Sequence, residues 1–157
     1  MTEKLLFLSL LGILVSMPAA ENANAAAASG PPKSKQAYES LKPMAEEGRA
    51  VAQHELGVMY RTGKGAPQND AQAARWFRKA AEQGLAEAQN NLGGLYATGR
   101  GVSRDIVKAY AWFMLAADQG LAEAKANRAR LAKQMSGDQL ARGKQMASRQ
   151  LARKPSE

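Results

Sequence analysis

The sequence of 157 residues contains no cysteine and a single histidine, His54. Without cysteine the chain can form no disulfide and can carry no lipid on an N-terminal cysteine. A transition-metal site draws its ligands from clustered His, Cys and carboxylate side chains, so this composition argues against such a site. We therefore expect a fold held together by packing alone, without a metal or another cofactor.

The sequence also lacks a hydrophobic run long enough to anchor it in a bilayer. The apolar run at residues 5–17 has 13 residues, whereas a membrane span needs about 20. A lysine precedes this run, and an A-x-A triplet follows it at residues 23–25. This three-part pattern predicts a secretory signal peptide over residues 1–25, cleaved after Ala25, and hence a periplasmic or secreted protein. The Ala-, Pro- and Ser-rich residues 26–35 predict a disordered leader.

Acidic residues are scarce at the C-terminal end. Without its first 25 residues the chain has 21 Lys and Arg against 12 Asp and Glu, and residues 121–157 alone have 9 against 3. A basic end on an exported protein favours an acidic partner or an anionic cell-wall or membrane surface, although a solubilising face is the simpler alternative. No aromatic residue lies among these basic residues. That absence and the export signal argue against nucleic acid as the partner.

Three glycines, Gly48, Gly84 and Gly120, lie 36 residues apart. An alignment of residues 48–83 with residues 84–119 gives 16 identities in 36 positions, which indicates an internal repeat. The predicted organisation is a repeat array over residues 36–135, with full units at 48–83 and 84–119 and flanking half-units, followed by a capping helix at 136–153.

Each unit has the apolar spacing of two helices, and no stretch shows the alternation of a strand. The predicted helices cover residues 49–61 and 70–82 in the first unit and 85–97 and 106–118 in the second. Asn69 and Asp105 are suited to capping the second helices, and Gly84 and Gly120 follow the ends of those helices. The class is therefore all-α. Pro43 should kink or restart the helix of the first half-unit.

Gly57 and Gly93 occupy equivalent positions inside the first helices, where glycine costs about 1 kcal/mol relative to alanine. Their recurrence predicts a packing role, in which the Trp and Phe of the second helix approach the glycine backbone closely. The Gly-rich loops at residues 60–65 and 96–101 ("YRTGKG" and "YATGRG") resemble phosphate loops only superficially. They follow helices and recur with the repeat, so we interpret them as interhelical joints with positive φ angles at glycine.

The repeat resembles a known family. The pattern A-x-A-Q-x-x-L-G-x-x-Y-x-x-G-x-G, followed by Asp or Asn, Ala, Trp and A-A-x-Q-G, is similar to the Sel1-like repeat, a relative of the tetratricopeptide repeat. The similarity covers about residues 37–124. It implies a right-handed α-solenoid of helix-turn-helix repeats and a protein-interaction scaffold. For exported bacterial members it implies a role in the envelope or outside the cell. Some exported relatives are rich in cysteine, and this chain departs from that branch.

An enzymatic function is disfavoured by the residues available. A hydrolase triad needs a nucleophile, a base and an orienting acid, but no serine lies in a G-x-S-x-G turn, and the counterpart of His54 is Asn90. A position that changes in this way is typical of a surface. Paired carboxylates for glycoside cleavage stay open as an alternative, but acidic residues recur with the period, as Glu87 and Glu123 do. Such recurrence favours helix-surface roles, and we expect no catalytic residues.

Repeat arrays bind partners along the surface formed by stacked equivalent helices, where positions that differ between units are free to recognise a ligand. Small residues at Gly94 and Ala97 leave room for a partner's side chain. The alternative is simple divergence at solvated positions. The predicted partner-binding positions are Val51, His54, Glu55, Val58 and Arg61 in the first unit, Glu87, Asn90, Asn91, Gly94 and Ala97 in the second, and Glu123, Asn127 and Arg130 in the third.

The C-terminal segment departs from the repeat. Arg128 and Ala129 replace the leucine and glycine of the earlier units, and Ser136 with Gln139 forms a capping-box pattern that opens a last helix over 137–153. Leu140, Ala147 and Leu151 are expected on the core side of this helix. Arg142, Arg149 and Arg153 are expected on the opposite side, as the best candidate for a basic contact surface.

Together these features predict an exported, non-enzymatic scaffold that binds a protein or peptide. The alternative is a cell-wall or anionic-surface binder that acts through its basic C-terminal helix, and a small envelope hydrolase is the least favoured reading.

Overall fold

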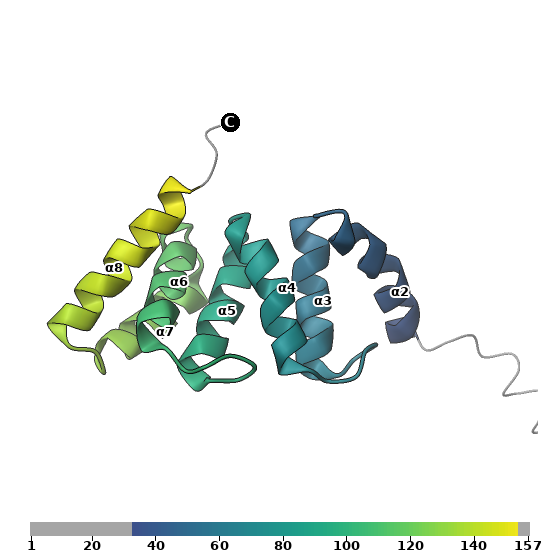
Figure 1. The fold of residues 1–157 in the computed structure, drawn as a ribbon, viewed down its shortest axis with the longest axis horizontal. Coiled ribbons are helices and arrows are strands. Elements are labelled where there is room, and N and C mark those ends of the chain that lie inside the picture. Colours follow the sequence, from purple (N-terminus) through teal and green to yellow (C-terminus); the bar gives the residue numbers. More distant parts are fainter. Residues whose placement is uncertain (1–32, 154–157) are drawn as a thin grey trace, which may run out of the picture. The chain divides into compact units, whose positions relative to one another are not determined.

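A computed structural model describes residues 33–153 of the chain. The predicted signal peptide and residues 26–32 of the predicted leader lie outside these residues. The described part is all-α, as predicted, and no helix in it is long and apolar enough to cross a membrane. Its helices are α2 (Lys33–Glu46), α3 (Ala50–Thr62), α4 (Asp70–Glu82), α5 (Ala86–Thr98), α6 (Ile106–Asp118), α7 (Ala122–Ala132) and α8 (Gly137–Ala152) (Figure 1).

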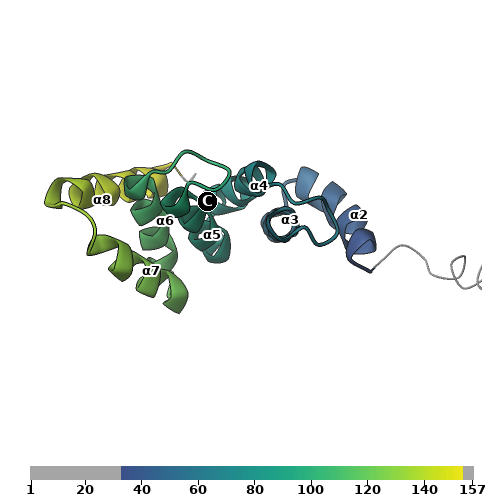
Figure 2. The same ribbon diagram turned by 90° about the horizontal axis from the view of Figure 1, so that it is seen from below.

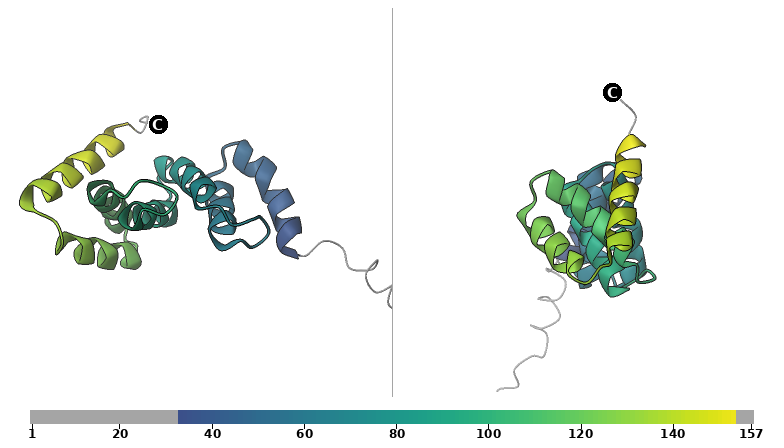
Figure 3. Two further views of the ribbon diagram at one scale, coloured as in Figure 1. Left: turned by 60° about the horizontal axis from the view of Figure 1, so that its bottom comes forward. Right: turned by 90° about the vertical axis from the view of Figure 1, so that its left-hand side faces the viewer.

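The helices from α2 to α7 pack consecutively, each against the next in the chain. Two layers result, one formed by α3, α5 and α7 and the other by α4, α6 and α8 (Figure 2). The last helix breaks the order, because α8 packs mainly on α6 and turns away from α7 (Figure 3, left). The array is therefore a stack of helix-turn-helix units whose last helix joins the outer end of the second layer.

The predicted glycine ends of the helices are confirmed. Gly84 and Gly120 have φ angles of 97°. At the first of them the Leu85 N–H bonds the Ala80 carbonyl at 3.2 Å and the Gly84 N–H bonds Ala81 at 2.9 Å. These two bonds form a Schellman motif, which satisfies carbonyls that the helix end would leave without a partner. The same pair of bonds recurs after α6, so each unit enters the next at the same angle.

The two mid-helix glycines meet aromatic rings. A Cβ atom at Gly57 would lie 2.6 Å from Cδ1 of Phe77, and one at Gly93 would lie 2.8 Å from Cδ1 of Phe113. Both distances are shorter than a real Cβ contact allows, so only glycine fits. This confirms the predicted packing role, with one change: in both units the nearest ring is the phenylalanine and not the tryptophan.

Two buried glutamines connect successive units. Gln53 and Gln89 donate to the Ala45 and Ala81 carbonyls at 3.0 and 3.2 Å, and accept from Gln83 and Gln119 at 2.7 and 2.8 Å. The acceptor carbonyls lie at the end of the preceding helix, so each glutamine fixes the joint between one unit and the next. Lys125 occupies the equivalent position in α7 and is exposed, so this contact ends with α5.

Two predictions near the start of the array are wrong. Residues 33–35 were assigned to a disordered leader, but α2 begins at Lys33. Pro43 was expected to kink or restart this helix, yet α2 continues through it to Glu46. Proline removes one N–H donor from a helix. The carbonyl left without that donor belongs to exposed Glu39, where water can replace the lost bond.

Candidate partner-binding surfaces

Most of the predicted partner-binding positions lie on one side of α3, α5 and α7. We call this side the ladder face, and it includes His54, Asn90, Asn91, Gly94 and Asn127. Hydrogen bonds from α3 to α5 and from α5 to α7 cross it in a repeating pattern. The Asn91 amide bonds Nε2 of His54 at 2.9 Å, and the Asn127 amide donates to Oδ1 of Asn90 at 3.0 Å. Both bonds join residues 37 positions apart. Side chains that differ between units therefore make equivalent contacts.

His54 is not the surface position that the sequence predicted. Its side chain is only 14% exposed and its ring lies 5.6 Å from that of Phe77. Nε2 faces Asn91, and Nδ1 lies 3.4 Å from Oε1 of Glu55. Arg61 donates to Oδ1 of Asn91 at 2.9 Å. Thus the bond between Nε2 and Asn91 joins α3 to α5.

Asn90 was also expected to be available to a partner, but it is only 7% exposed. The other predicted positions divide by exposure. Val51 is 64% exposed, and Glu55, Glu87, Glu123 and Arg130 are exposed as well. Half-buried positions are Val58, Arg61, Asn91, Gly94, Ala97 and Asn127.

Two hollows flank Gly94 on the ladder face. One, of about 260 Å³, is lined in part by Ala97 and Arg130, and the other, of about 200 Å³, in part by Arg61 and Glu123. A Cβ atom at Gly94 would meet nothing within 4 Å. Gly94 is thus unlike its neighbour Gly93, because its missing side chain leaves open space and not a ring contact.

The Gly-rich loops are joints, as predicted. Gly63 and Gly99 both have φ angles of 74°. Gly101 lies against the Asp70 carbonyl at the start of α4, where a Cβ atom would clash. Arg100 pairs with the Asp70 carboxylate through Nε at 3.1 Å and through a second nitrogen at 3.2 Å. The loop is therefore fixed to the preceding unit by backbone contact and by a two-point ion pair.

The start of α8 confirms the predicted capping box. Oγ of Ser136 accepts from the Gln139 N–H at 3.2 Å, and the Ser136 N–H donates to Oε1 of Gln139 at 2.9 Å. The side of α8 that packs was predicted only in part. Ala147 is buried as expected, but Leu151 is 56% exposed and so lies outside the core. Gly143 takes part instead, since a Cβ atom there would lie 2.7 Å from Cδ1 of Tyr110.

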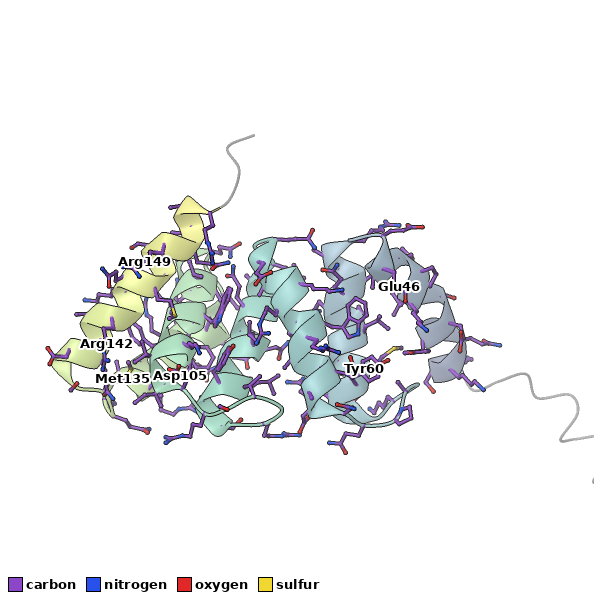
Figure 4. All side chains as sticks on the ribbon, viewed as in Figure 1. Glu46, Tyr60, Asp105, Met135, Arg142 and Arg149 are labelled. Carbon is purple, nitrogen blue, oxygen red and sulfur yellow. The ribbon has the colours of Figure 1, made fainter. Side chains whose placement is uncertain are left out.

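A hollow of about 850 Å³ lies between α8 and the start of α6. Arg142, Arg149 and Arg153 line it, together with Asp105 and Met146. Figure 4 shows Arg142 and Arg149 along α8. Within residues 33–153 none of these arginines takes part in an ion pair. The predicted basic surface is therefore hollowed where it adjoins α6.

Asp105 caps α6 through two backbone bonds, from the N–H groups of Val107 and Lys108, both at 3.0 Å. The Lys108 ammonium also lies 3.3 Å from its carboxylate. Burial raises the pKa of Asp105, but the hydrogen bonds and the Lys108 charge together outweigh it, so that the pKa lies below its ordinary value. At neutral pH the carboxylate is thus engaged within its own helix.

The side chains of the described residues offer no cluster of three His, Cys, Asp or Glu that could hold a metal. The Tyr60 hydroxyl lies 2.9 Å from that of Tyr38, and the pKa of Tyr60 is raised above its ordinary value. This hydrogen bond is the main cause of the raised Tyr60 pKa, and burial adds to it. The tyrosine pair joins α2 to α3. The two surfaces present hydrogen-bonding groups, arginine charge and exposed apolar groups.

Sequence reasoning missed two contacts. The first is the pair of hydrogen bonds on the ladder face, from His54 to Asn91 and from Asn90 to Asn127. Each joins residues 37 positions apart, so an alignment of the units at the 36-residue period does not pair them. Asn91 and Asn127 are identical and 36 residues apart, which was the available signal. The contact of Gly143 with Tyr110 had no signal in the repeat, because α8 lies outside the period.

The array is similar to a known repeat family and to solved structures. Residues 50–85 and 86–121 each match the Sel1 repeat. A solved protective antigen of uropathogenic Escherichia coli strains, which displays an SLR (Sel1-like repeat) fold, is similar with a TM-score of 0.75 and 35% identity over 83% of this chain. A Sel1 repeat protein from Oxalobacter formigenes gives a TM-score of 0.58 and 39% identity over 60% of this chain. This chain covers 28% and 38% of those two chains. No curated protein matches it.

Proposed function

Because the chain belongs to the Sel1 repeat family, we propose that it is a non-enzymatic scaffold that binds a protein or peptide partner through its ladder face. We place this activity in the cell envelope or outside the cell, on the basis of the signal pattern at residues 1–25. Sel1 repeats generally mediate protein interactions, which supports the class of function but identifies no partner.

The observation that carries the proposal is the pair of hollows beside Gly94. Glycine is disfavoured inside a helix, and a Cβ atom at Gly94 would meet nothing within 4 Å. The hollows have polar donors on their rims, among them Arg61, Asn127 and Arg130. Arg61 and Asn127 are already held by hydrogen bonds to Asn91 and Asn90, so these two donors need little ordering when a partner side chain enters this space.

A non-enzymatic role is favoured by the state of His54. A general base needs a ring nitrogen free to take a proton from a nucleophile or a water. Here Nε2 bonds the Asn91 amide, and the Glu55 carboxylate lies 3.4 Å from Nδ1. The residue whose type suggests catalysis is instead committed to joining α3 and α5.

Photo-cross-linking in intact cells tests the proposal. A photoreactive residue at Val51, which is exposed on α3, is expected to capture one main partner. The control is the same residue at Arg75, which is exposed on α4 in the other layer. Equal products from both positions, or none from Val51, would contradict a role for the ladder face.

Binding to an anionic cell-wall or membrane surface is a second candidate function, favoured by the arginines of α8, which form no ion pair with the described residues. The test is sedimentation with isolated cell wall or anionic vesicles at two salt concentrations, before and after Arg142, Arg149 and Arg153 are changed to Glu. Salt-sensitive binding that the changes remove would favour this function, and equal sedimentation of both proteins would eliminate it.

A further inference from the structure

The hollow between α8 and the start of α6 continues into a second one. The first has about 850 Å³ and the second about 290 Å³. They share Met146, Gln150 and Arg153, all on α8, so we treat them as one α6–α8 groove. Its larger part falls within the range of about 300–1,000 Å³ that is typical of ligand sites. It lies in the layer of α4, α6 and α8, away from the ladder face.

The floor of the groove is apolar. Val107 and Met146 line the larger part, and Trp112 and Leu115 line the smaller part. Met146 is 37% exposed and Trp112 is half-buried. An adaptable methionine beside an aromatic ring suits an apolar anchor, because both can pack against side chains of several shapes.

The rim on α8 is basic, and its arginines form no ion pair within residues 33–153. Arg142, Arg149 and Arg153 follow a spacing of seven and four residues, which places them on one side of the helix. Asp105 lines the larger hollow, where two backbone N–H groups and Lys108 already engage it, and Glu82 lines the smaller hollow. The three guanidinium groups thus remain available to carboxylates from another molecule within the described part of the chain.

We propose that the α6–α8 groove binds an acidic segment of a partner protein, with an apolar side chain seated on Met146 and Trp112 and carboxylates facing the three arginines. This inference rests on the proposed scaffold role and adds a second site to it. The distance along α8 from Arg142 to Arg153 is about 17 Å, so about five residues of extended chain would span it. Arginine suits such a ligand because it bonds carboxylates at two points.

A hollowed site favours a protein segment over an anionic surface. A flat membrane or polymer layer can meet the arginine heads, but it leaves the apolar floor uncovered. A peptide can satisfy both the rim and the floor. Binding of a protein segment should therefore depend on an apolar side chain in the ligand, whereas binding of an anionic surface should not.

The test uses the full chain and a labelled eight-residue peptide in which Glu residues flank a central Leu-Phe pair. Two further peptides replace the Glu residues by Lys or the Leu-Phe pair by Ser-Ser, and vesicles of anionic phospholipid serve as the other class. Fluorescence anisotropy is measured at two salt concentrations for the parent protein and for Arg149→Glu. Lys144→Glu is the matched control, since Lys144 is exposed on the same helix but does not line the groove.

The acidic Leu-Phe peptide is expected to bind in a salt-sensitive manner and to lose about tenfold in affinity with Arg149→Glu. With Lys144→Glu its affinity should stay within about twofold. The Ser-Ser and Lys peptides should bind more weakly to the parent protein.

Three results would overturn the inference. They are equal binding of the acidic and Lys peptides, equal losses in the two variants, and vesicle binding that depends on Arg149 while the Leu-Phe pair makes no difference. A failure of the α6–α8 groove proposal can be told apart from a failure of the scaffold proposal. Cross-linking from Val51 reports the ladder face alone, and a Gly94→Arg protein should bind the peptide as the parent does.

Discussion

In the two full units a glycine of the first helix, Gly57 or Gly93, receives a phenylalanine ring of the second helix. At the C-terminal end the two partners have changed places, because Gly143 of the last helix receives the ring of Tyr110 from α6. Helices approach closely in both regions by the same means. Close packing of two helices therefore uses a contact between glycine and an aromatic ring in both regions. The glycine comes from the first helix in the full units and from α8 at the C-terminal end.

The regions also differ in their joints. In the full units buried glutamines and Schellman turns fix each helix to the one before it. At the end of the array Lys125 replaces the glutamine and α8 turns away from α7. The repeating part is therefore expected to behave as one cooperative unit, with α8 as its least secured element.

The largest effect should come from Gly93→Leu. The new side chain must displace the Phe113 ring or the α6 backbone, and overpacking of this kind costs about 3 kcal/mol of unfolding free energy. Gly94→Leu on the same helix is the control. It enters open space and gains about 0.5–1 kcal/mol from helix propensity. Chemical denaturation measures both, and similar stabilities for the two variants would show that the phenylalanine contact does not hold the units together.

Gly143→Leu should have a smaller and local effect, of about 2 kcal/mol. Displacement of Tyr110 releases α8 but leaves the joints between α3 and α6 intact. Hydrogen exchange should show lost protection in α8 with little change in α3–α6. If protection fell equally throughout, α8 would be part of the cooperative unit and the contrast between the two regions would fail.

Gln89→Ala should cost about 1–2 kcal/mol, because it removes the two hydrogen bonds that join Gln89 to the Ala81 carbonyl and to the Gln119 amide. Lys125→Ala at the equivalent position of α7 should change the unfolding free energy by less than about 0.5 kcal/mol. Thermal unfolding of the two variants compares a joint inside the array with one at its end. A larger loss for the Lys125 change would reverse the comparison.

The smallest expected effect is on the pH dependence of stability. Since the pKa of Asp105 is lowered in the folded chain, its contribution is fully present above the ordinary value of 3.8 and is lost as pH falls through the lower folded pKa. Asp105→Asn should therefore reduce the fall in Tm between about pH 5 and pH 2. Asn69 supplies the matched position in the first unit, where Asn69→Asp should steepen that fall. If the dependence of Tm on pH were unchanged in both variants, Asp105 would have no role in the pH dependence of stability.

The sequence allowed the helix order, the glycine turns and the caps to be predicted, because period and local turn chemistry depend on neighbouring residues. The approximate bounds of the helices followed from the same features. The sequence did not reveal that the side chains of His54 and Asn90 are largely buried, since their hydrogen-bond partners lie 37 residues away in the next unit. Leu151 was misplaced for a related reason: the direction of α8 is set by the contact between Gly143 and Tyr110, and the repeat period contains no information about it.

The most direct test of the central claim, that the ladder face binds a protein, is the affinity of Gly94→Arg for the partner cross-linked through Val51. Because a Cβ atom at Gly94 meets nothing within 4 Å and arginine favours a helix more than glycine does, the variant should have a Tm no lower than that of the parent while its side chain fills the hollows. The control Ser40→Arg places the same charge at an exposed position on α2. We predict a loss of at least about tenfold in affinity for Gly94→Arg alone. Unchanged affinity in a correctly folded Gly94→Arg protein would contradict the claim.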